Sequence, residues 1–127
     1  MKSCLSIKTD YSILSSLIKI PDLISYAINN HIAALGIIDD NLSSSMEFIL
    51  ECQKNNIKPL VSLEVNYQDS KIYLYAKDEQ GLHNLFKINT ILLNNPLIIN
   101  DLKKYINNLI ILLPYNSIKL YDKLKTI

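Results

Sequence analysis

Polar and charged side chains stand where three apolar runs of this sequence end, and they are the residues best placed to do chemistry. Ser6 and Lys8 close the first run, Asp39 and Asp40 follow the second, and Glu64 lies in the third. Adjacent carboxylates of this kind supply the oxygen ligands that a hard cation such as Mg²⁺ prefers. The alternative is that one carboxylate of the pair caps the following turn while the other stays solvated.

The other reactive groups do not complete a catalytic or metal-binding set. His31 and His83 are the two histidines, and both lie far along the chain from the ends of the apolar runs. We expect His31 at a helix terminus and His83 on a solvated helix face, so no imidazole metal cluster is predicted. Cys4 and Cys52 are widely separated and lack CxxC spacing, which predicts free thiols, with Cys52 in the core.

The apolar runs alternate with amphipathic stretches, and this alternation is typical of a parallel α/β sheet or barrel. Chemistry in such folds gathers at the carboxyl ends of the strands, which is where the residues above lie. Pro21 and the capping-box pair Ser44 and Glu47 mark helix starts, and Asp78 is expected to cap a third helix. We expect strands over 4–7, 33–38, 59–67, 71–76 and 109–113, the last one buried, with a hairpin turn at 68–70, and helices over 20–31, 44–56, 78–94, 100–105 and 116–125, caps included.

The composition excludes several classes of protein. The chain has 127 residues, of which 49% are hydrophobic and 20% charged, so it can build a core and is not expected to be disordered. All 13 basic residues are Lys and the net charge is +1, which argues against a nucleic-acid binder held by a basic patch. No signal-peptide core and no membrane span is visible. We therefore expect a cytoplasmic protein without membrane contact.

Four blocks of the sequence follow the order of one family's motifs. Residues 5–14 are similar to L-H-x-H-T-x-Y-S-x-L, residues 34–41 to A-L-A-x-T-D-H-G-N, residues 57–65 to I-K-P-I-x-G-x-E-V, and residues 74–85 to L-L-A-K-N-E-x-G-Y-x-N-L. These motifs are those of the PHP (polymerase and histidinol phosphatase) domain, and the chain resembles the version at the N-terminus of bacterial DNA polymerase III alpha subunits. The resemblance runs over nearly the whole chain.

The resemblance implies a fold and a chemistry. The family domain is a distorted barrel of seven strand–helix units, about twice as long as this chain. Residues 1–127 therefore resemble a single segment, the first half of that domain: a partial PHP-type (β/α) barrel with mostly parallel strands and one inserted hairpin. In active members, histidines and carboxylates at the strand ends bind metal ions that activate water for phosphoester hydrolysis.

The departures from the family motifs weaken the expected metal site. The His-x-His pair is replaced by Ser6 and Lys8, and the Asp-His pair by Asp39 and Asp40, so that Asp39 and Glu64 alone match ligand positions in kind. An ammonium at Lys8 opposes cation binding, and we hypothesise that it pairs with Asp39 or Glu64. The vestigial metal candidates are therefore Asp39, Asp40 and Glu64. No catalytic or cofactor-binding residue is predicted, although residual binding of Mg²⁺, Mn²⁺ or Zn²⁺ stays open.

The resemblance implies a structural segment of a replicative DNA polymerase. Its partners would be the rest of the alpha subunit or other replisome proteins, with DNA contacted through the parent polymerase only. Whether the segment is itself an enzyme is left open. One alternative is an active metal-dependent PHP phosphoesterase. Another is a stand-alone module that associates with itself through an open sheet edge.

Overall fold

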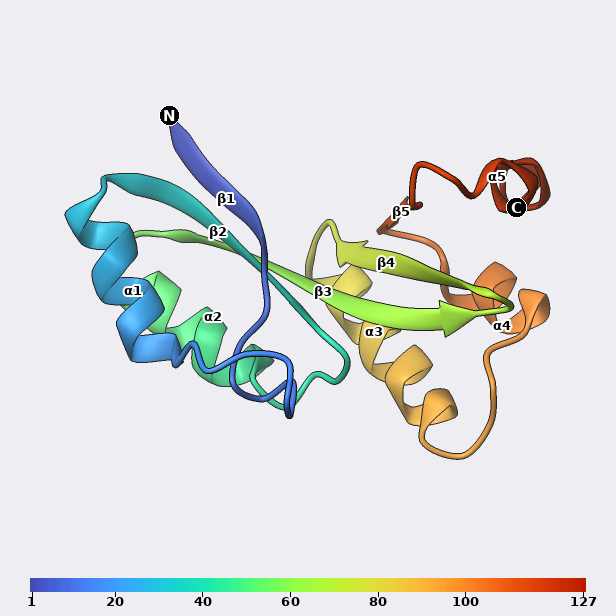
Figure 1. The fold of residues 1–127 in the computed structure, drawn as a ribbon, viewed down its shortest axis with the longest axis horizontal. Helices are drawn as coiled ribbons and strands as arrows, with labels where there is room; N and C mark the ends of the chain where they lie inside the picture. Colours follow the sequence, from blue (N-terminus) through green and yellow to red (C-terminus); the bar gives the residue numbers. More distant parts are fainter. The chain divides into compact units, whose positions relative to one another are not determined.

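The computed structural model describes residues 1–127 apart from the side chain of Ile118, and its elements follow the predicted order (Figure 1). They are β1 (Lys2–Ile7), α1 (Ile20–Asn29), β2 (Ile32–Asp39), α2 (Ser45–Lys54), β3 (Lys58–Tyr67), β4 (Ser70–Ala76), α3 (Glu79–Leu92), α4 (Ile99–Tyr105), β5 (Leu109–Leu112) and α5 (Ile118–Leu124). Backbone hydrogen bonds join the strands in the order β1-β2-β3-β4-β5. The α/β class is confirmed, and the sheet has two ends rather than closing into a barrel.

Two compact units divide the chain, at residues 1–63 and 64–127. Strand β3 contributes its first residues to the first unit and its last four to the second. The prediction that residues 1–127 form a single domain segment stays a prediction.

Unit 1 is built on three parallel strands. The β1 residue Cys4 stands opposite Leu35 of β2, and Ile37 of β2 stands opposite Val61 of β3. The last six residues of β2 are buried, as expected for an apolar strand that is covered on both faces. Helices α1 and α2 lie on the same side of these strands (Figure 1). Their buried side chains are Ile20, Leu23, Ile24 and Ala27 of α1 and Ser45, Phe48 and Cys52 of α2.

Both helices of unit 1 are followed by a residue in the left-handed region of φ. His31 follows α1 with a φ of 55°, and Asn56 follows α2 with a φ of 56°. A left-handed residue lets the chain reverse after the last helical turn, and glycine usually occupies that place. The prediction that His31 lies at a helix terminus is therefore confirmed.

The predicted capping box of α2 is wrong. Ser44 has a helical backbone conformation and makes no side-chain cap. Its hydroxyl donates instead to Asp39, and Glu47 accepts a hydrogen bond from the Tyr11 hydroxyl over 2.8 Å. That hydrogen bond, with the negative charge of Glu47, raises the pKa of Tyr11 above its usual value of 10.0. Ser44 thus bonds a carboxylate five residues earlier, and Glu47 bonds a tyrosine 36 residues earlier, so neither side chain caps the helix.

Both cysteines are free thiols and Cys52 lies in the core, as predicted, whereas the exposure of Cys4 was not predicted. Cys52 is fully buried in α2, and Cys4 is exposed in β1. Burial, and secondarily the charge of Glu51, raises the pKa of the Cys52 thiol to about 12. Cys52 is therefore a protonated packing residue at neutral pH.

Unit 2 contains the hairpin of β3 and β4 and the antiparallel pair of β4 and β5. Tyr73 stands opposite Leu112, and Ala76 stands opposite Leu109. Strand β5 was expected to be buried, and this is wrong. It pairs with β4 at the end of the sheet, and its Ile110 and Leu112 side chains are 46% and 48% exposed. Helices α3 and α4 pack against each other.

The start of α3 is fixed to the turn that precedes β5. Asp78 caps the helix, as predicted, by accepting from the Gly81 N–H over 2.8 Å, and its other oxygen accepts from the Asn108 side chain over 2.8 Å. These two bonds hold the pKa of the Asp78 carboxyl below its usual value. The Asn108 carbonyl accepts from the Lys77 N–H over 3.0 Å, and Asn108 has a left-handed φ of 62°.

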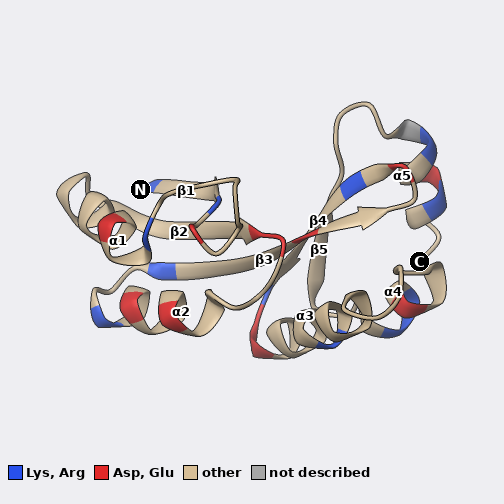
Figure 2. Cartoon of the chain, turned by 60° about the horizontal axis from the view of Figure 1, so that its bottom comes forward, with Lys and Arg blue, Asp and Glu red and all other residues tan. Residues whose placement is uncertain are grey.

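Helix α1 carries one acidic residue and no Lys, whereas α2 to α5 each carry both Lys and acidic residues (Figure 2). In the part of the chain that the structure describes, the helices all fall short of the length and apolarity needed to cross a bilayer.

Candidate functional site at the strand ends

The carboxylate of Asp39, at the end of β2, is 1% exposed and accepts four hydrogen bonds. Oδ1 accepts from the Thr9 backbone N–H over 2.9 Å and from the Ser12 hydroxyl over 2.8 Å. Oδ2 accepts from the Thr9 hydroxyl over 2.7 Å and from the Ser44 hydroxyl over 2.8 Å. A buried charge needs such compensation, and here neutral dipoles supply it.

The Asp39 cluster, defined as Asp39 with Thr9, Ser12 and Ser44, joins three segments of unit 1. Thr9 and Ser12 belong to the loop after β1, and Ser44 directly precedes α2. All three donors are buried. Since each carboxylate oxygen already has two donors, a cation could bind Asp39 only by displacing some of them. The arrangement suits a cluster that holds three segments together rather than a site open to a metal ion.

Asp40 lies beside Asp39 in sequence, but it is exposed. Its Oδ1 accepts from the Asn41 side chain over 2.8 Å, and that same Asn41 amide donates to the Tyr11 carbonyl over 3.0 Å. The two aspartates therefore do not share an environment. The binding of a cation by this pair stays a prediction, as does its alternative, a carboxylate that caps the following turn beside a solvated one.

Ser6 and Lys8 flank the end of β1. Ser6 is exposed within the strand, and Lys8 is half-buried just beyond it. The sequence analysis hypothesised that Lys8 pairs with either Asp39 or Glu64. Asp39 takes its hydrogen bonds from hydroxyl and amide donors instead of from Lys8. Pairing of Lys8 with Glu64 stays a prediction.

Glu64 forms an ion pair in β3 that was not predicted from the sequence. Its Oε1 lies 2.8 Å from Nζ of Lys71 in β4. The Glu64 side chain is 10% exposed and that of Lys71 is 54% exposed, so the pair lies at the boundary between core and solvent. The two residues stand seven apart on either side of the hairpin turn, which is a spacing that places diagonal cross-strand neighbours on one face.

The strand-end residues do not assemble a metal-binding set. Among the residues described, no group of three or more His, Cys, Asp or Glu side chains comes close enough to hold a metal ion. His31 lies between α1 and β2, at the opposite end of β2 from Asp39, and His83 lies in α3. The side chains present at the strand ends therefore do not fit the metal cluster that the family motifs imply.

Thr9, Ser12 and Ser44 are the site residues that the sequence analysis missed. Ser12 has no histidine or lysine at a spacing that would make it a nucleophile, so the sequence gives it no catalytic role. One signal in the sequence could have indicated them: Thr9 and Ser12 closely follow a strand, and Ser44 directly precedes a helix. Such residues commonly bond to nearby backbone, and here their hydroxyls converge on one carboxylate instead.

The sequence of this chain is similar to a family model and to several known proteins. The family model described as "PHP domain" matches residues 5–122. The DNA polymerase III subunit alpha of Mycoplasma genitalium is 36% identical over 107 residues, covering 81% of this chain and 12% of that protein. The same subunit of Streptococcus pyogenes serotype M3 is 34% identical over 115 residues, covering 87% of this chain and 11% of that protein. The chain thus spans about an eighth of the length of these relatives.

One solved structure is similar in fold. It is a protein of Bifidobacterium adolescentis to which a metal-dependent phosphoesterase activity has been ascribed. The two share 12% sequence identity with a TM-score of 0.51, and the match covers 84% of this chain and 44% of that one. At this identity the likeness concerns the fold alone.

Proposed function

This chain belongs to the PHP domain family, and from that premise we propose that it forms the N-terminal PHP segment of a bacterial DNA polymerase III alpha subunit, acting in DNA replication. Two relatives with that name support the proposal, at 36% and 34% identity over most of this chain. Each matches over a small share of a much longer polypeptide. The segment would be the first part of a distorted barrel in such a protein.

We further propose that the segment is structural rather than catalytic. The observation that carries this is the Asp39 cluster, in which both oxygens of the one buried carboxylate after β2 are engaged by neutral donors. Ser6 and Lys8 provide no metal ligand that could replace the family's imidazoles, and a protonated Lys8 repels cations. Residues 9–12, the end of β2 and the start of α2 would together form a rigid base for the polymerase body.

The location and partners follow from the same proposal. The segment would act in the cytoplasm, its partners would be the rest of the alpha subunit and other replisome proteins, and it would meet DNA only through the parent polymerase. Self-association through the exposed β5 edge is the alternative that the half-exposed Ile110 and Leu112 favour.

Protein size in the source cell tests the polymerase proposal. An antibody raised against this chain is expected to detect a polypeptide about seven times as long as this chain, because 107 matched residues make up 12% of the Mycoplasma relative. Immunoprecipitates of that polypeptide should extend a primed DNA template. A sole product of 14.5 kDa without polymerase activity would contradict the proposal.

Metal-dependent hydrolysis tests the structural role. The purified chain, supplied with Mn²⁺ or Zn²⁺, is expected to release no p-nitrophenol from p-nitrophenyl phosphate and no nucleotide from labelled single-stranded DNA beyond the rate seen with EDTA. The phosphoesterase alternative predicts hydrolysis that EDTA abolishes. The phosphoesterase alternative would be established if Glu64→Gln removed that activity and Glu79→Gln did not. Glu79→Gln is the matched control, because it makes the same substitution at an exposed residue of α3.

A further inference from the structure

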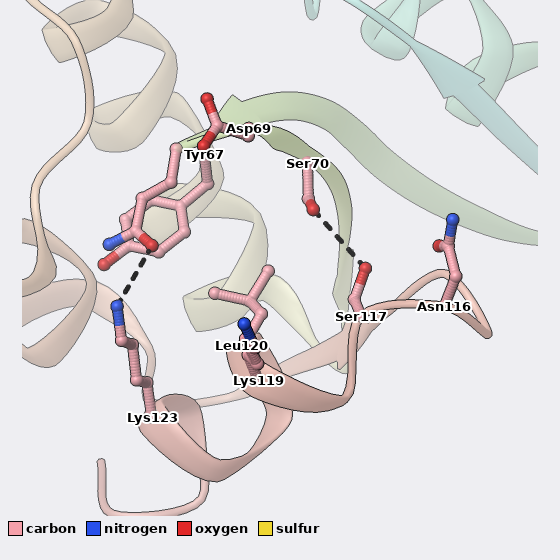
Figure 3. Close-up of a pocket in the computed structure, with 9 residues that line it drawn as sticks. Tyr67, Asp69, Ser70, Asn116, Ser117, Lys119, Leu120 and Lys123 are labelled. Atoms are coloured by element: carbon pink, nitrogen blue, oxygen red, sulfur yellow. Dashed lines mark hydrogen bonds between the residues drawn. The ribbon is translucent and has the colours of Figure 1, made fainter.

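A hollow of about 550 Å³ lies in unit 2 (Figure 3). One wall is the turn between β3 and β4, from Tyr67 to Ser70, and the other is the stretch from Asn116 to Lys123 that includes part of α5. Figure 3 shows Lys123 reaching from α5 toward the turn, and Lys119 and Leu120 belong to the same wall. Small-molecule sites in proteins have volumes of roughly 300–1,000 Å³, so the hollow is of suitable size.

Two hydrogen bonds link the walls, and both are long. The Ser117 hydroxyl lies 3.4 Å from the Ser70 hydroxyl, and Nζ of Lys123 lies 3.5 Å from the Gln68 side-chain oxygen. Bonds at these distances are weak, because hydroxyl pairs prefer about 2.8 Å and N–H donors about 2.9 Å. The polar groups that face the hollow are therefore available for exchange with a ligand.

The charges of the lining favour an anion. Lys119 and Lys123 stand four residues apart on α5, so that they lie on the same side of the helix. Both side chains are exposed, and Asp69 is the carboxylate among the described lining residues. Two ammonium groups against one carboxylate leave the hollow with a net positive charge.

The lining also limits the chemistry. The described lining residues include no imidazole and no thiol, so neither proton transfer by histidine nor attack by a cysteine is available from them. Tyr67 and Leu120 are 2% and 7% exposed, and they supply apolar surface at the border of the core. The Ser70 and Ser117 hydroxyls both donate and accept, and Asp69 accepts only, which suits a ligand with hydroxyl groups of its own.

From these features we propose that the hollow binds a small phosphorylated, hydroxyl-bearing molecule, namely a sugar phosphate or a nucleotide. Lys119 and Lys123 hold the phosphate, whose two negative charges match their two ammonium groups. Ser70, Ser117 and Asp69 hydrogen-bond the hydroxyl groups. This site shares no residue with the Asp39 cluster or with Glu64, and its existence does not depend on the proposed role in replication.

Calorimetric titration of the whole chain tests the proposal with three probes: ribose 5-phosphate, adenosine 5′-monophosphate and inorganic phosphate. The two organic phosphates should bind saturably and more tightly than inorganic phosphate. Equal affinity for the two assigns the site to a sugar phosphate, and tighter binding of the nucleotide assigns it to a nucleotide. Inorganic phosphate binding as tightly as both, or no saturable binding by either organic phosphate, would overturn the proposal.

Two double Lys→Gln variants, one in the hollow and one outside it, test whether the ligand binds in the hollow. The double variant Lys119→Gln/Lys123→Gln should bind the preferred probe at least tenfold more weakly. Lys103→Gln/Lys104→Gln, which removes the same charge from the last turn of α4 outside the hollow, should bind within twofold of the unchanged chain. Equal weakening in both would show nonspecific charge attraction and would refute the site.

A milder variant guards against loss of folding. Ser70→Ala removes one hydroxyl from the hollow and leaves both lysines in place, and it is expected to weaken binding about threefold, the effect of a hydrogen bond worth about 0.65 kcal/mol. The backbone amide resonances of Ser70 and Ser117 should shift on titration. Shifts confined to residues outside the hollow would also count against the proposal.

Discussion

Replacing Asp39 with asparagine is expected to lower the free energy of unfolding by about 3–5 kcal/mol. The amide keeps one accepting oxygen and places an NH₂ group where the other oxygen accepted two hydrogen bonds. Each hydrogen bond to a charged group contributes about 1.5–3 kcal/mol, and the buried donors left behind cannot reach water. Urea unfolding followed by circular dichroism measures the change.

The adjacent residue provides the control for this prediction. Asp40→Asn is the same chemical change one residue further along, at an exposed side chain, and it should alter the free energy of unfolding by no more than about 0.5 kcal/mol. If Asp39→Asn does not fold, Thr9→Val removes a single hydroxyl donor of the cluster, at an expected loss of about 1–2 kcal/mol. Equal stability of the Asp39→Asn and Asp40→Asn variants would contradict the structural role of the cluster.

Gly81→Ala is expected to destabilise the chain by about 2–3 kcal/mol, the usual scale for overpacking. Two effects oppose each other here. Alanine in place of glycine in a helix gains about 1 kcal/mol of helix propensity. However, a Cβ at Gly81 would lie 2.2 Å from the Asn108 carbonyl oxygen, which is backbone rather than a side chain that could swing away. That carbonyl is fixed by the Lys77 N–H, and the Asn108 side chain is fixed by Asp78, so the clash outweighs the gain.

Thermal or urea unfolding checks the Gly81 prediction against a neighbour. Gln80→Ala changes the exposed preceding residue of the same helical turn and should leave the stability within about 0.5 kcal/mol. A Gly81→Ala chain as stable as the Gln80→Ala chain would mean that the turn before β5 moves away at little cost, and the attachment of the start of α3 to that turn would be refuted.

The order of elements could be predicted from the sequence because its signals are local. Periodicity, Pro21 and Asp78 each act within a turn or a strand of the residues they organise. The predictions that failed depend on contacts that lie outside the local motif. Ser44 has the local form of a capping box, but its hydroxyl is drawn to the buried Asp39 carboxylate. Strand β5 is apolar enough to be buried, but its place in the sheet order is set by pairing with a strand more than thirty residues earlier.

For the candidate site, the sequence identified the carboxylates better than the residues that contact them. Asp39 and Glu64 were identified as residues needing partners, since a charge after a buried strand cannot remain uncompensated. Lys8 was the partner predicted for one of them; its pairing with Glu64 stays a prediction, whereas the donors to Asp39 were not predicted. Thr9 and Ser12 lie 30 and 27 residues before Asp39, so no short spacing connects them to it. Lys71 was nearer to prediction, because the hairpin turn between it and Glu64 had been recognised.

The left-handed residues show what scarcity of glycine does to this backbone. The chain has two glycines, and a Cβ at either Gly36 or Gly81 would meet neighbouring backbone. None is left for the left-handed positions, which fall to His31, Asn56, Asn108 and others. Histidine in this conformation costs about 1–2 kcal/mol relative to glycine, which adopts it freely. The scarcity of glycine therefore leaves strained backbone at the turns where the chain reverses after a helix.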